Sequence, residues 1–443
     1  MTLSVYVLGR EVATLEAIGD FKSSMTYLAQ TAPADFVSLT MHVRPKSYAW
    51  DDVLPPIFQM NLPEGYLLQV LQEQFGPHVG ASPLALLSVI GRNMIGRIQV
   101  APASARLDEP PKPVDVAALL QGDNSEEAFA ELVRQHAASG VSGIVPKFLD
   151  GEVETIASRG HKKVTLLTHR HIIKGSSRLL PFVSLNEHLC MQVAARVMPA
   201  AKTDVSRDGQ ALVVTRFDTD ENGARHWGME DFCVLLGLRP AAKYETTWER
   251  IAKAVRDHVP TVSRAQVFRE MATLLLLNYA LRNADCHAKN VALRYASLDD
   301  VHLAPAYDVI TTAAYPEYRN NPPGISFMGK KTWDPGKSLP NFVTATFGLN
   351  LREQNEIVER IADAVIDVAP DVRRAMVEHP GFVDIGKRML LAWQEGLAGL
   401  RGKRVYALGE ASLGEAFCGF SDPAPVEAER KVVGRSELLG KRR

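Results

Sequence analysis

A long apolar segment that ends abruptly in a polar loop most constrains the fold of this chain. Residues 264–282, RAQVFREMATLLLLNYALR, have the composition of a buried helix, and Ser263 with Gln266 fits a capping box at its start. The next eight residues, NADCHAKN (283–290), are mostly polar, and VALRY (291–295) then predicts a short strand. A buried helix therefore delivers a polar loop that is followed by a strand, an order typical of catalytic loops.

Composition places the chain among soluble globular proteins. It has 443 residues, of which 46% are hydrophobic and 23% charged, enough for two or three domains with cores of their own. A formal charge of −1 gives no overall attraction to nucleic acid or to acidic membranes. The four cysteines lack CxxC spacing, which argues against a zinc site or a disulfide framework. No leader pattern and no run near about 20 apolar residues is visible, so we expect a cytoplasmic protein without a membrane partner.

The order of patterns predicts an α+β fold in four parts. Strands are expected at LSVYVLG (3–9) and FVSLTMHV (36–43), and helices at EGYLLQVLQEQFG (64–76), SPLALLSVIG (82–91) and SEEAFAELVRQHAA (125–138). A Pro-rich, charged stretch at 102–115 indicates a linker. From Phe232 onward the pattern is mostly helical, and the last stretch is basic with little apolar periodicity. The predicted parts are 1–105, a β-rich unit at 106–218, a helical unit at 219–423 and a mobile tail at 424–443.

Asp285 and Asn290 lie five positions apart on the polar loop. Phosphoryl transfer from ATP needs a carboxylate beside the attacking hydroxyl and an oxygen ligand on a magnesium ion, and a D-x-x-x-x-N loop supplies both. The same pair can also serve only to bond backbone groups after a helix. The spacing alone leaves both readings open.

Asp308 favours a role of this pair in phosphoryl transfer. In VHLAPAYDVI (301–310) it closes a short apolar run that predicts a strand. Kinase-like enzymes place a second magnesium ligand at such a strand end, downstream of the catalytic loop.

Two upstream residues fit the same chemistry. VTLLTHRHIIK ends a β-branched run on Lys174, the position of a strand lysine that neutralises ATP phosphates. Glu187, near the start of the helix predicted from NEHLCMQVAARVM, can pair with Lys174 or can cap the helix with Ser184. His169 and His171 share one face of the predicted strand without a third ligand nearby, which favours a structural role over a metal site.

A glycine-containing loop and a strand end complete the set. SGVSGIVPK (139–147) holds Gly140 and Gly143, which let backbone N–H groups approach phosphate oxygens. ALVVTRFD (211–218) predicts a strand that leads into a hinge able to hold adenine, where Phe217 either stacks on the base or belongs to the core.

Taken in order, SGVSGIVPK, HIIK, NEHLC, RFD, NADCHAKN and LAPAYD resemble the HipA family, the kinase toxins of bacterial toxin–antitoxin modules. LPPIFQMNLPEGYL and LLSVIGRNMIGRIQV resemble its N-terminal subdomain, so the resemblance covers nearly the whole chain. It implies a two-lobed, protein-kinase-like or phosphoinositide-kinase-like fold, and a serine/threonine protein kinase that uses ATP and Mg²⁺. A small helix-turn-helix antitoxin of HipB type, which would supply the only contact to operator DNA, is the implied partner, and aminoacyl-tRNA synthetases are the implied targets.

The resemblance also assigns residues to roles. The implied catalytic base is Asp285, and the implied magnesium ligands are Asn290 and Asp308. The implied ATP contacts are Ser142, Gly143, Ile144, Val145, Pro146, Lys147, Lys174, Thr215, Arg216, Phe217, His287, Lys289 and Tyr307.

Two departures from the family pattern concern the loop at 139–147. Several members carry an autophosphorylated serine where this chain has Gly140, so such control is expected to be weak, absent or relocated to Ser139 or Ser142. Val145 replaces a polar residue of the common VQPK form, which puts one loop contact in doubt.

Two alternatives remain open at this point. A small-molecule kinase of the aminoglycoside-phosphotransferase type also has a D-x-H-x-x-N loop, which Asp285, His287 and Asn290 fit, although it needs no N-terminal unit. An inactive kinase-fold partner of a DNA-binding repressor is the non-enzymatic alternative. The presence of Lys174 and Asp308 beside the loop residues favours an active enzyme.

Overall fold

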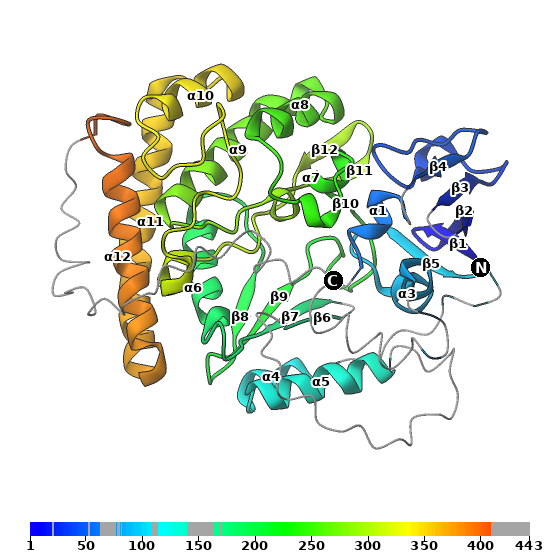
Figure 1. Cartoon of the computed structure of the whole chain (residues 1–443), viewed down its shortest axis with the longest axis horizontal. Helices are drawn as coiled ribbons and strands as arrows, with labels where there is room; N and C mark the ends of the chain where they lie inside the picture. Colours follow the sequence, from blue (N-terminus) through cyan, green and yellow to red (C-terminus); the bar gives the residue numbers. More distant parts are fainter. Residues whose placement is uncertain are drawn as a thin grey trace. The chain divides into compact units, whose positions relative to one another are not determined.

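The computed structural model divides the chain into two compact units (Figure 1). Unit 1 comprises Met1–Leu179, Ser206–Pro240 and Ala292–Val301, and unit 2 comprises Leu180–Val205, Ala241–Val291 and the chain from His302 onward. The structure describes residues 1–408 except 20–21, 52–53, 63–76, 78–79, 81, 104, 106, 108–113, 140–163 and 169. The helix expected at 64–76, the loop at 140–147, His169 and the basic tail therefore lie outside the described residues.

A five-stranded antiparallel sheet begins unit 1, with the order β4-β3-β2-β1-β5. Its strands are β1 (Thr2–Val7), β2 (Arg10–Ala17), β3 (Ser23–Tyr27), β4 (Tyr48–Trp50) and β5 (Ile98–Pro102). Leu3, Val5 and Val7 alternate along β1 and are fully buried, together with Leu15 and Val100 on neighbouring strands. The strand predicted at 3–9 is confirmed.

The strand predicted at 36–43 is wrong, because this segment forms a tight turn in which Ser38 and Met41 make an isolated bridge. The buried carboxylate of Glu230 holds the turn, accepting hydrogen bonds from the Ser38 hydroxyl and the Leu39 N–H, both at 2.7 Å. A buried carboxylate needs such donors, and this distant partner outweighs the local β-propensity.

The described part of unit 1 also contains helices. They are α1 (Pro56–Gln59), α3 (Pro83–Ile90), α4 (Val116–Gln121), α5 (Glu126–Ser139) and α7 (Phe232–Leu235), with the 3₁₀ turns η1 (Pro33–Asp35) and η2 (Gly91–Asn93). The Ser82 side chain caps α3 by accepting a hydrogen bond from the Ala85 N–H. The helices predicted at 82–91 and 125–138 are confirmed.

A second sheet of unit 1 contains β6 (Val164–Leu167), β7 (His171–Gly175) and β9 (Ala211–Thr215), all antiparallel. The run VTLLTHRHIIK is thus a hairpin and not one strand, because the Thr168 N–H and hydroxyl both bond to the His171 carbonyl and close a turn. Helices α4 and α5 lie along this sheet (Figure 1). A Cβ at Gly175 would lie 2.7 Å from the Phe129 ring, so α5 packs closely on β7.

The strands β10 (Gly228–Asp231) and β11 (Ala292–Ser297) pair antiparallel, and β12 (Asp300–Leu303) follows after a short turn. The strand predicted at 291–295 is confirmed as β11. Against expectation, β12 ends at Leu303 and does not reach Asp308.

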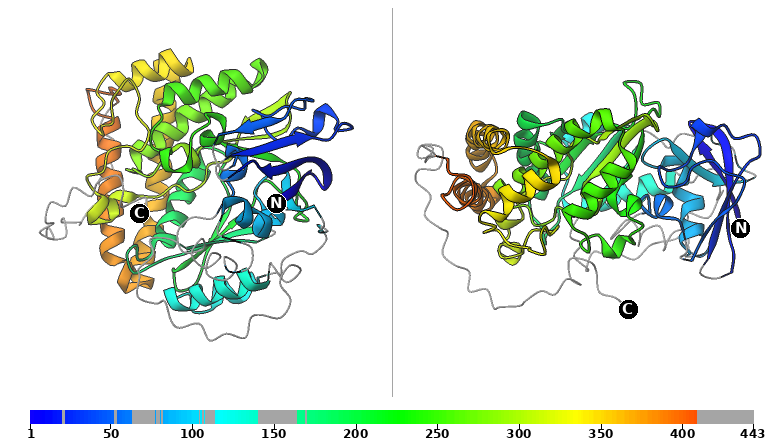
Figure 2. Two further views of the ribbon diagram at one scale, coloured as in Figure 1. Left: turned by 45° about the vertical axis from the view of Figure 1, so that its right-hand side comes forward. Right: turned by 90° about the horizontal axis from the view of Figure 1, so that it is seen from above.

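Unit 2 is mostly helical. Its elements are α6 (Val183–Val197), β8 (Thr203–Val205), α8 (Trp248–His258), α9 (Thr261–Ala280), α10 (Ser338–Phe347), α11 (Leu351–Glu378) and α12 (Val383–Leu400). Helices α11 and α12 lie side by side (Figure 2), and α12 also packs on α9. A Cβ at Gly396 would lie 2.2 Å from the Ala280 carbonyl oxygen, so α12 fixes the end of α9 at the start of the polar loop.

The capping box predicted at Ser263 is wrong, and so is the capping alternative for Glu187. Helix α9 begins at Thr261, directly after Pro260, so Ser263 lies inside its first turn. Helix α6 begins at Val183 after Phe182 in the left-handed conformation, which places Ser184 inside that helix as well. Among the described residues, no helix combines the length and apolar character needed to cross a bilayer.

Candidate active site

Hydrogen bonds between asparagine side chains and the backbone hold the polar loop after α9. The Asn283 N–H donates to the Asn278 carbonyl at 3.0 Å, and the Asn283 amide donates to the Asn278 side-chain oxygen at 2.7 Å. The Asn283 side-chain oxygen in turn accepts from the Asp285 N–H at 3.0 Å. Because Asn278 and Asn283 are buried, these bonds satisfy the chain where the helix ends and fix the backbone of Asp285.

The two residues that define the D-x-x-x-x-N pattern are brought together. The Asn290 side-chain amide donates to the Asp285 carbonyl oxygen at 2.9 Å, and the Asn290 N–H donates to the His287 carbonyl at 2.9 Å. The 3₁₀ turn η4 (Ala288–Asn290) therefore closes the loop on itself. In the described part of the chain nothing donates to the Asn290 Oδ1, so this oxygen is available as a ligand atom.

Asp308 lies on an irregular segment and not at a strand end. Ala306 forms a parallel bridge with Ala200, and Asp308 then adopts a left-handed backbone with φ of 56°. Aspartate tolerates this conformation better than most residues. The Tyr307 hydroxyl donates to the Lys289 carbonyl at 2.7 Å, which joins this segment to the polar loop.

Paired threonines fasten the same segment on its other side. The Thr312 hydroxyl accepts from the Ala284 N–H at 2.8 Å and donates to the Arg282 carbonyl at 2.9 Å. The backbone of Thr311 makes two bonds with the Asn186 side chain on α6, at 2.9 and 3.0 Å. Asp285, Asn290 and Asp308 therefore belong to two segments that are bonded to each other within unit 2.

His287 is neutral near pH 7. Burial lowers its pKa to about 4, against the opposing charge of Asp285. Its Nε2 lies 4.0 Å from the Asp285 Oδ1, too far for a hydrogen bond. Any contact of His287 with a nucleotide would therefore come from an uncharged imidazole.

Gly324 packs against the backbone of the polar loop. A Cβ at this position would lie 2.2 Å from the Cys286 carbonyl oxygen and 2.9 Å from that of Ala284. Neither backbone atom can move without shifting Asp285, so the close approach helps to define the loop.

We expect Gly324→Ala to destabilise the protein by about 1–3 kcal/mol, the usual cost of overpacking. The measurement is urea unfolding, with Gly399→Ala on α12 as the control because a Cβ at Gly399 would have no neighbour within 4 Å. A Gly324 variant as stable as the control variant would contradict this role of the close approach.

The other predicted ATP contacts lie in unit 1, in unit 2 or in the loop outside the described residues. Lys174 lies on β7, paired with Thr165 and Leu212, in unit 1, whereas Glu187 is buried on α6 in unit 2. Their ion pair stays a prediction. Ser139 is the last residue of α5, and Ser142, Gly143, Ile144, Val145, Pro146 and Lys147 lie outside the described residues.

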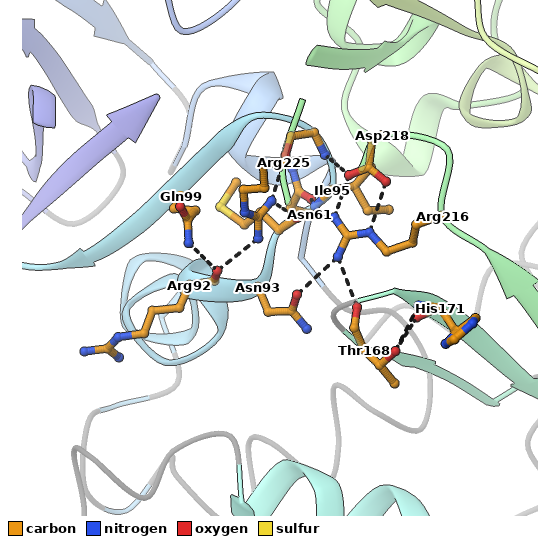
Figure 3. Close-up of polar contacts among 12 residues, drawn as sticks. Asn61, Arg92, Asn93, Ile95, Gln99, Thr168, His171, Arg216, Asp218 and Arg225 are labelled. Carbon is orange, nitrogen blue, oxygen red and sulfur yellow. Dashed lines mark hydrogen bonds and ion pairs between the residues drawn. The ribbon is translucent and has the colours of Figure 1, made fainter. Parts of the chain in front are cut away.

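Arg216, expected in the hinge after β9, is buried in a hydrogen-bonded cluster of unit 1 (Figure 3). Its guanidinium makes a two-point ion pair with Asp218, at 2.5 and 3.0 Å. It also donates to the Met94 carbonyl at 2.9 Å and to the Thr168 carbonyl at 3.1 Å. The Arg216 N–H bonds to the Arg170 carbonyl at 2.9 Å, so neither this N–H nor the side chain is placed to bind adenine.

Comparison with known protein families finds two domains of one family in this chain. The HipA N-terminal domain matches residues 3–101, and the HipA-like C-terminal domain matches residues 139–371. The chain belongs to the HipA family. Among curated relatives, Y4dM and Y4mE of Sinorhizobium fredii, both named as candidate kinases, are 26% and 29% identical to it. Each alignment covers 71% of this chain and 78% or 79% of the relative.

The fold agrees with this assignment. A HipA of Shewanella oneidensis, solved in a complex with HipB and its operator DNA, superposes with a TM-score of 0.61 at 18% identity. The superposition covers 92% of this chain and 98% of that one. The predicted kinase-like α+β fold is confirmed, and with the named relatives it makes this chain a HipA-type kinase.

Several residues that shape the HipA site were not predicted from the sequence. The polar loop is contacted by Tyr244, Thr312 and Gly324. Within the loop Asn283 bonds to Asp285, and Thr311 joins the segment of Asp308 to Asn186 on α6. Only Asn283 carried a local signal, since a helix that ends in Asn-Ala-Asp favours an Asx-type turn. The others lie far from Asp285 in sequence or carry no motif.

Proposed function

We propose that this HipA-type kinase is an ATP- and Mg²⁺-dependent serine/threonine protein kinase that acts as the toxin of a bacterial toxin–antitoxin module. The observation that carries the proposal is the bonded pair of segments that holds Asp285, Asn290 and Asp308 in one unit. A carboxylate, an amide oxygen and a second carboxylate are the groups that phosphoryl transfer from a metal-bound nucleotide requires.

The residues present fit magnesium. Mg²⁺ prefers oxygen ligands and usually takes one or two protein carboxylates besides phosphate oxygens. Asn290 would offer its available Oδ1, and Asp308 its carboxylate. The bound ion would screen the charge of the triphosphate.

The protein groups would divide the remaining work. Asp285 would accept the proton of the attacking hydroxyl, while Lys174 would offset phosphate charge from β7. His287 would contact the nucleotide as a neutral hydrogen-bonding group, because its pKa of about 4 keeps it uncharged. Thr215 and Phe217 would flank the adenine through the backbone, since the Arg216 side chain is committed to Asp218.

The partner and target follow from the family. A helix-turn-helix antitoxin of HipB type would bind this chain, and operator DNA would be reached only through it, as in the Shewanella complex of HipA, HipB and DNA. The phosphorylated protein would be a component of translation such as an aminoacyl-tRNA synthetase, so that phosphorylation arrests growth. Control by autophosphorylation would be weak, absent or moved to Ser139 or Ser142, because Gly140 has no hydroxyl.

Calorimetric titration of a non-hydrolysable ATP analogue tests the metal assignment. We expect Asp308→Asn, which removes the charge but keeps a residue that tolerates the left-handed backbone, to weaken Mg²⁺-dependent binding about 10- to 100-fold. Asp334→Asn, at an exposed position of the same unit, serves as the control. Binding that neither EDTA nor Asp308→Asn weakens would show that Asp308 is not a magnesium ligand.

A further inference from the structure

Tyr244 contacts the carboxylate that we assign as the catalytic base. It lies in the turn between the 3₁₀ turn η3 (Pro240–Ala242) and α8, and its hydroxyl donates a hydrogen bond to the Asp285 Oδ1. Hydrogen bonds from a hydroxyl to an ionised carboxylate are among the stronger ones in proteins. The Asp285 side chain is 21% exposed, so this contact is only partly open to competition from water.

The backbone of this turn is bonded to the polar loop and to a third segment. The Lys243 carbonyl accepts from the Ala288 N–H at 3.0 Å, and the Lys331 ammonium donates to the Tyr244 carbonyl at 3.1 Å. The same ammonium also donates to the carbonyl of Gly324, the residue that packs on Cys286. The backbone at Lys243 and Tyr244 is therefore held by hydrogen bonds, which fixes the position from which the Tyr244 side chain extends to Asp285.

The ring of Tyr244 adds a second contact with the loop. It meets the buried His287 imidazole edge to face, with centroids 5.0 Å apart and an interplanar angle of 79°. This contact does not involve the hydroxyl, so a phenylalanine at position 244 would keep it.

The bond to Tyr244 uses only one of the two carboxylate oxygens. No described residue donates a hydrogen bond to the Asp285 Oδ2. A carboxylate whose Oδ1 is held can rotate little about its last bond, and its Oδ2 then keeps one direction.

We propose that Tyr244 is a positioning residue for phosphoryl transfer: it holds the Asp285 Oδ1 so that Oδ2 faces the hydroxyl of the protein substrate. This assignment rests on the proposed kinase function. In the step itself the substrate O–H bond breaks and its proton passes to Oδ2, the substrate oxygen bonds to the γ-phosphorus, and ADP leaves with the electrons of the broken P–O bond. Tyr244 keeps its own proton throughout.

The test compares the rates at which four proteins remove the γ-phosphate from [γ-³²P]ATP in the presence of Mg²⁺. The rate is the sum of labelled free phosphate and labelled protein formed. The four proteins are the wild type, Tyr244→Phe, Asp285→Asn and the variant that combines both changes. We expect Tyr244→Phe to lower kcat about 10- to 100-fold, the size of effect that lost alignment produces. The KM for ATP should change by less than about twofold, because the hydroxyl acts on the base and not on the nucleotide.

The combined variant separates positioning from a general structural role. If Tyr244 acts through the Asp285 carboxylate, removing its hydroxyl from the Asp285→Asn protein should slow transfer no further. Tyr406→Phe is the matched control, since it also removes a tyrosine hydroxyl of unit 2 that donates to a side chain, the Gln354 Oε1 at 2.7 Å. Its kcat should equal that of the wild type.

The outcomes are distinct. Transfer by Tyr244→Phe at the wild-type rate, in an assay where Asp285→Asn is slow, would overturn the positioning role and leave the kinase function standing. Additive losses in the combined variant would overturn it as well, because they would show that Tyr244 acts apart from the carboxylate. A wild type without any transfer would overturn the proposed function and the positioning role together.

Discussion

Bacteria that express the Asp285→Asn variant should grow nearly as fast as cells without the protein, whereas the wild type should arrest growth. The substitution replaces the proposed base with an amide of the same shape, so its hydrogen-bonding neighbours change little. Loss of a general base slows a reaction by about 10²- to 10⁴-fold. Because the base acts on the attacking hydroxyl and not on ATP, the variant should still bind an ATP analogue with affinity near that of the wild type.

The matched control is Asp257→Asn, which makes the same chemical change at an exposed position on α8 of the same unit. Growth and analogue binding should both equal those of the wild type. Growth arrest by the Asp285 variant at wild-type strength would contradict the kinase-toxin proposal and would favour inhibition through binding alone.

Asp218→Ala should destabilise the protein by about 3–5 kcal/mol, because it leaves the buried Arg216 guanidinium without its counter-charge. Both side chains are nearly inaccessible, with 1% and 3% of their surfaces exposed. Asp218 also accepts a hydrogen bond from the Gly96 N–H at 2.7 Å, so the variant loses a bond between the segment before β5 and the segment after β9. Urea unfolding followed by circular dichroism measures the loss.

The control for this prediction is an exposed ion pair. Arg352→Ala removes a pair with Glu356 in which the arginine is 89% exposed, and such pairs contribute about 0–1 kcal/mol. A loss for Asp218→Ala no larger than that of Arg352→Ala would contradict the structural role of the buried cluster.

The same cluster predicts the direction in which pH changes the stability of the fold. Burial alone would raise the pKa of Asp218, but the hydrogen bond and charge of Arg216, the Gly96 N–H and the charge of Arg225 together hold it below 3.8. The unfolded carboxyl therefore binds a proton more readily than the folded one, and acid favours unfolding. The contribution of Asp218 is present above pH 3.8 and is lost as the pH falls below it.

Elements with a clear local composition or period could be predicted from the sequence. The apolar run before the polar loop became α9, and the amphipathic run at 125–138 became α5. The start of α9, the start of α6 and the strand at 36–43 could not be predicted correctly. Backbone conformation at Pro260 and Phe182 and the distant contact of the buried Glu230 decide these places.

In the candidate site too, local features such as the polar loop after α9 could be predicted from the sequence and features set by distant contacts could not. The spacing of Asp285 and Asn290 left open whether the pair serves phosphoryl transfer or only bonds backbone groups. The structure adds one such backbone bond, from the Asn290 amide to the Asp285 carbonyl, which is local in sequence. Asp308 was expected at the end of a strand, but β12 stops short of it, and hydrogen bonds from Tyr307 and Thr312 hold its segment instead. Tyr244 lies 41 residues before Asp285, and nothing in its own sequence context indicates that it reaches the carboxylate.

The measurement that tests the kinase assignment most directly is transfer of the γ-phosphate from [γ-³²P]ATP by the purified protein to itself and to the proteins of a bacterial extract. The assignment predicts protein-bound label that requires Mg²⁺, disappears in EDTA and falls by about 10²-fold or more in the Asp285→Asn variant. Label that forms equally without the metal, or equally in the Asp285→Asn variant, would contradict it.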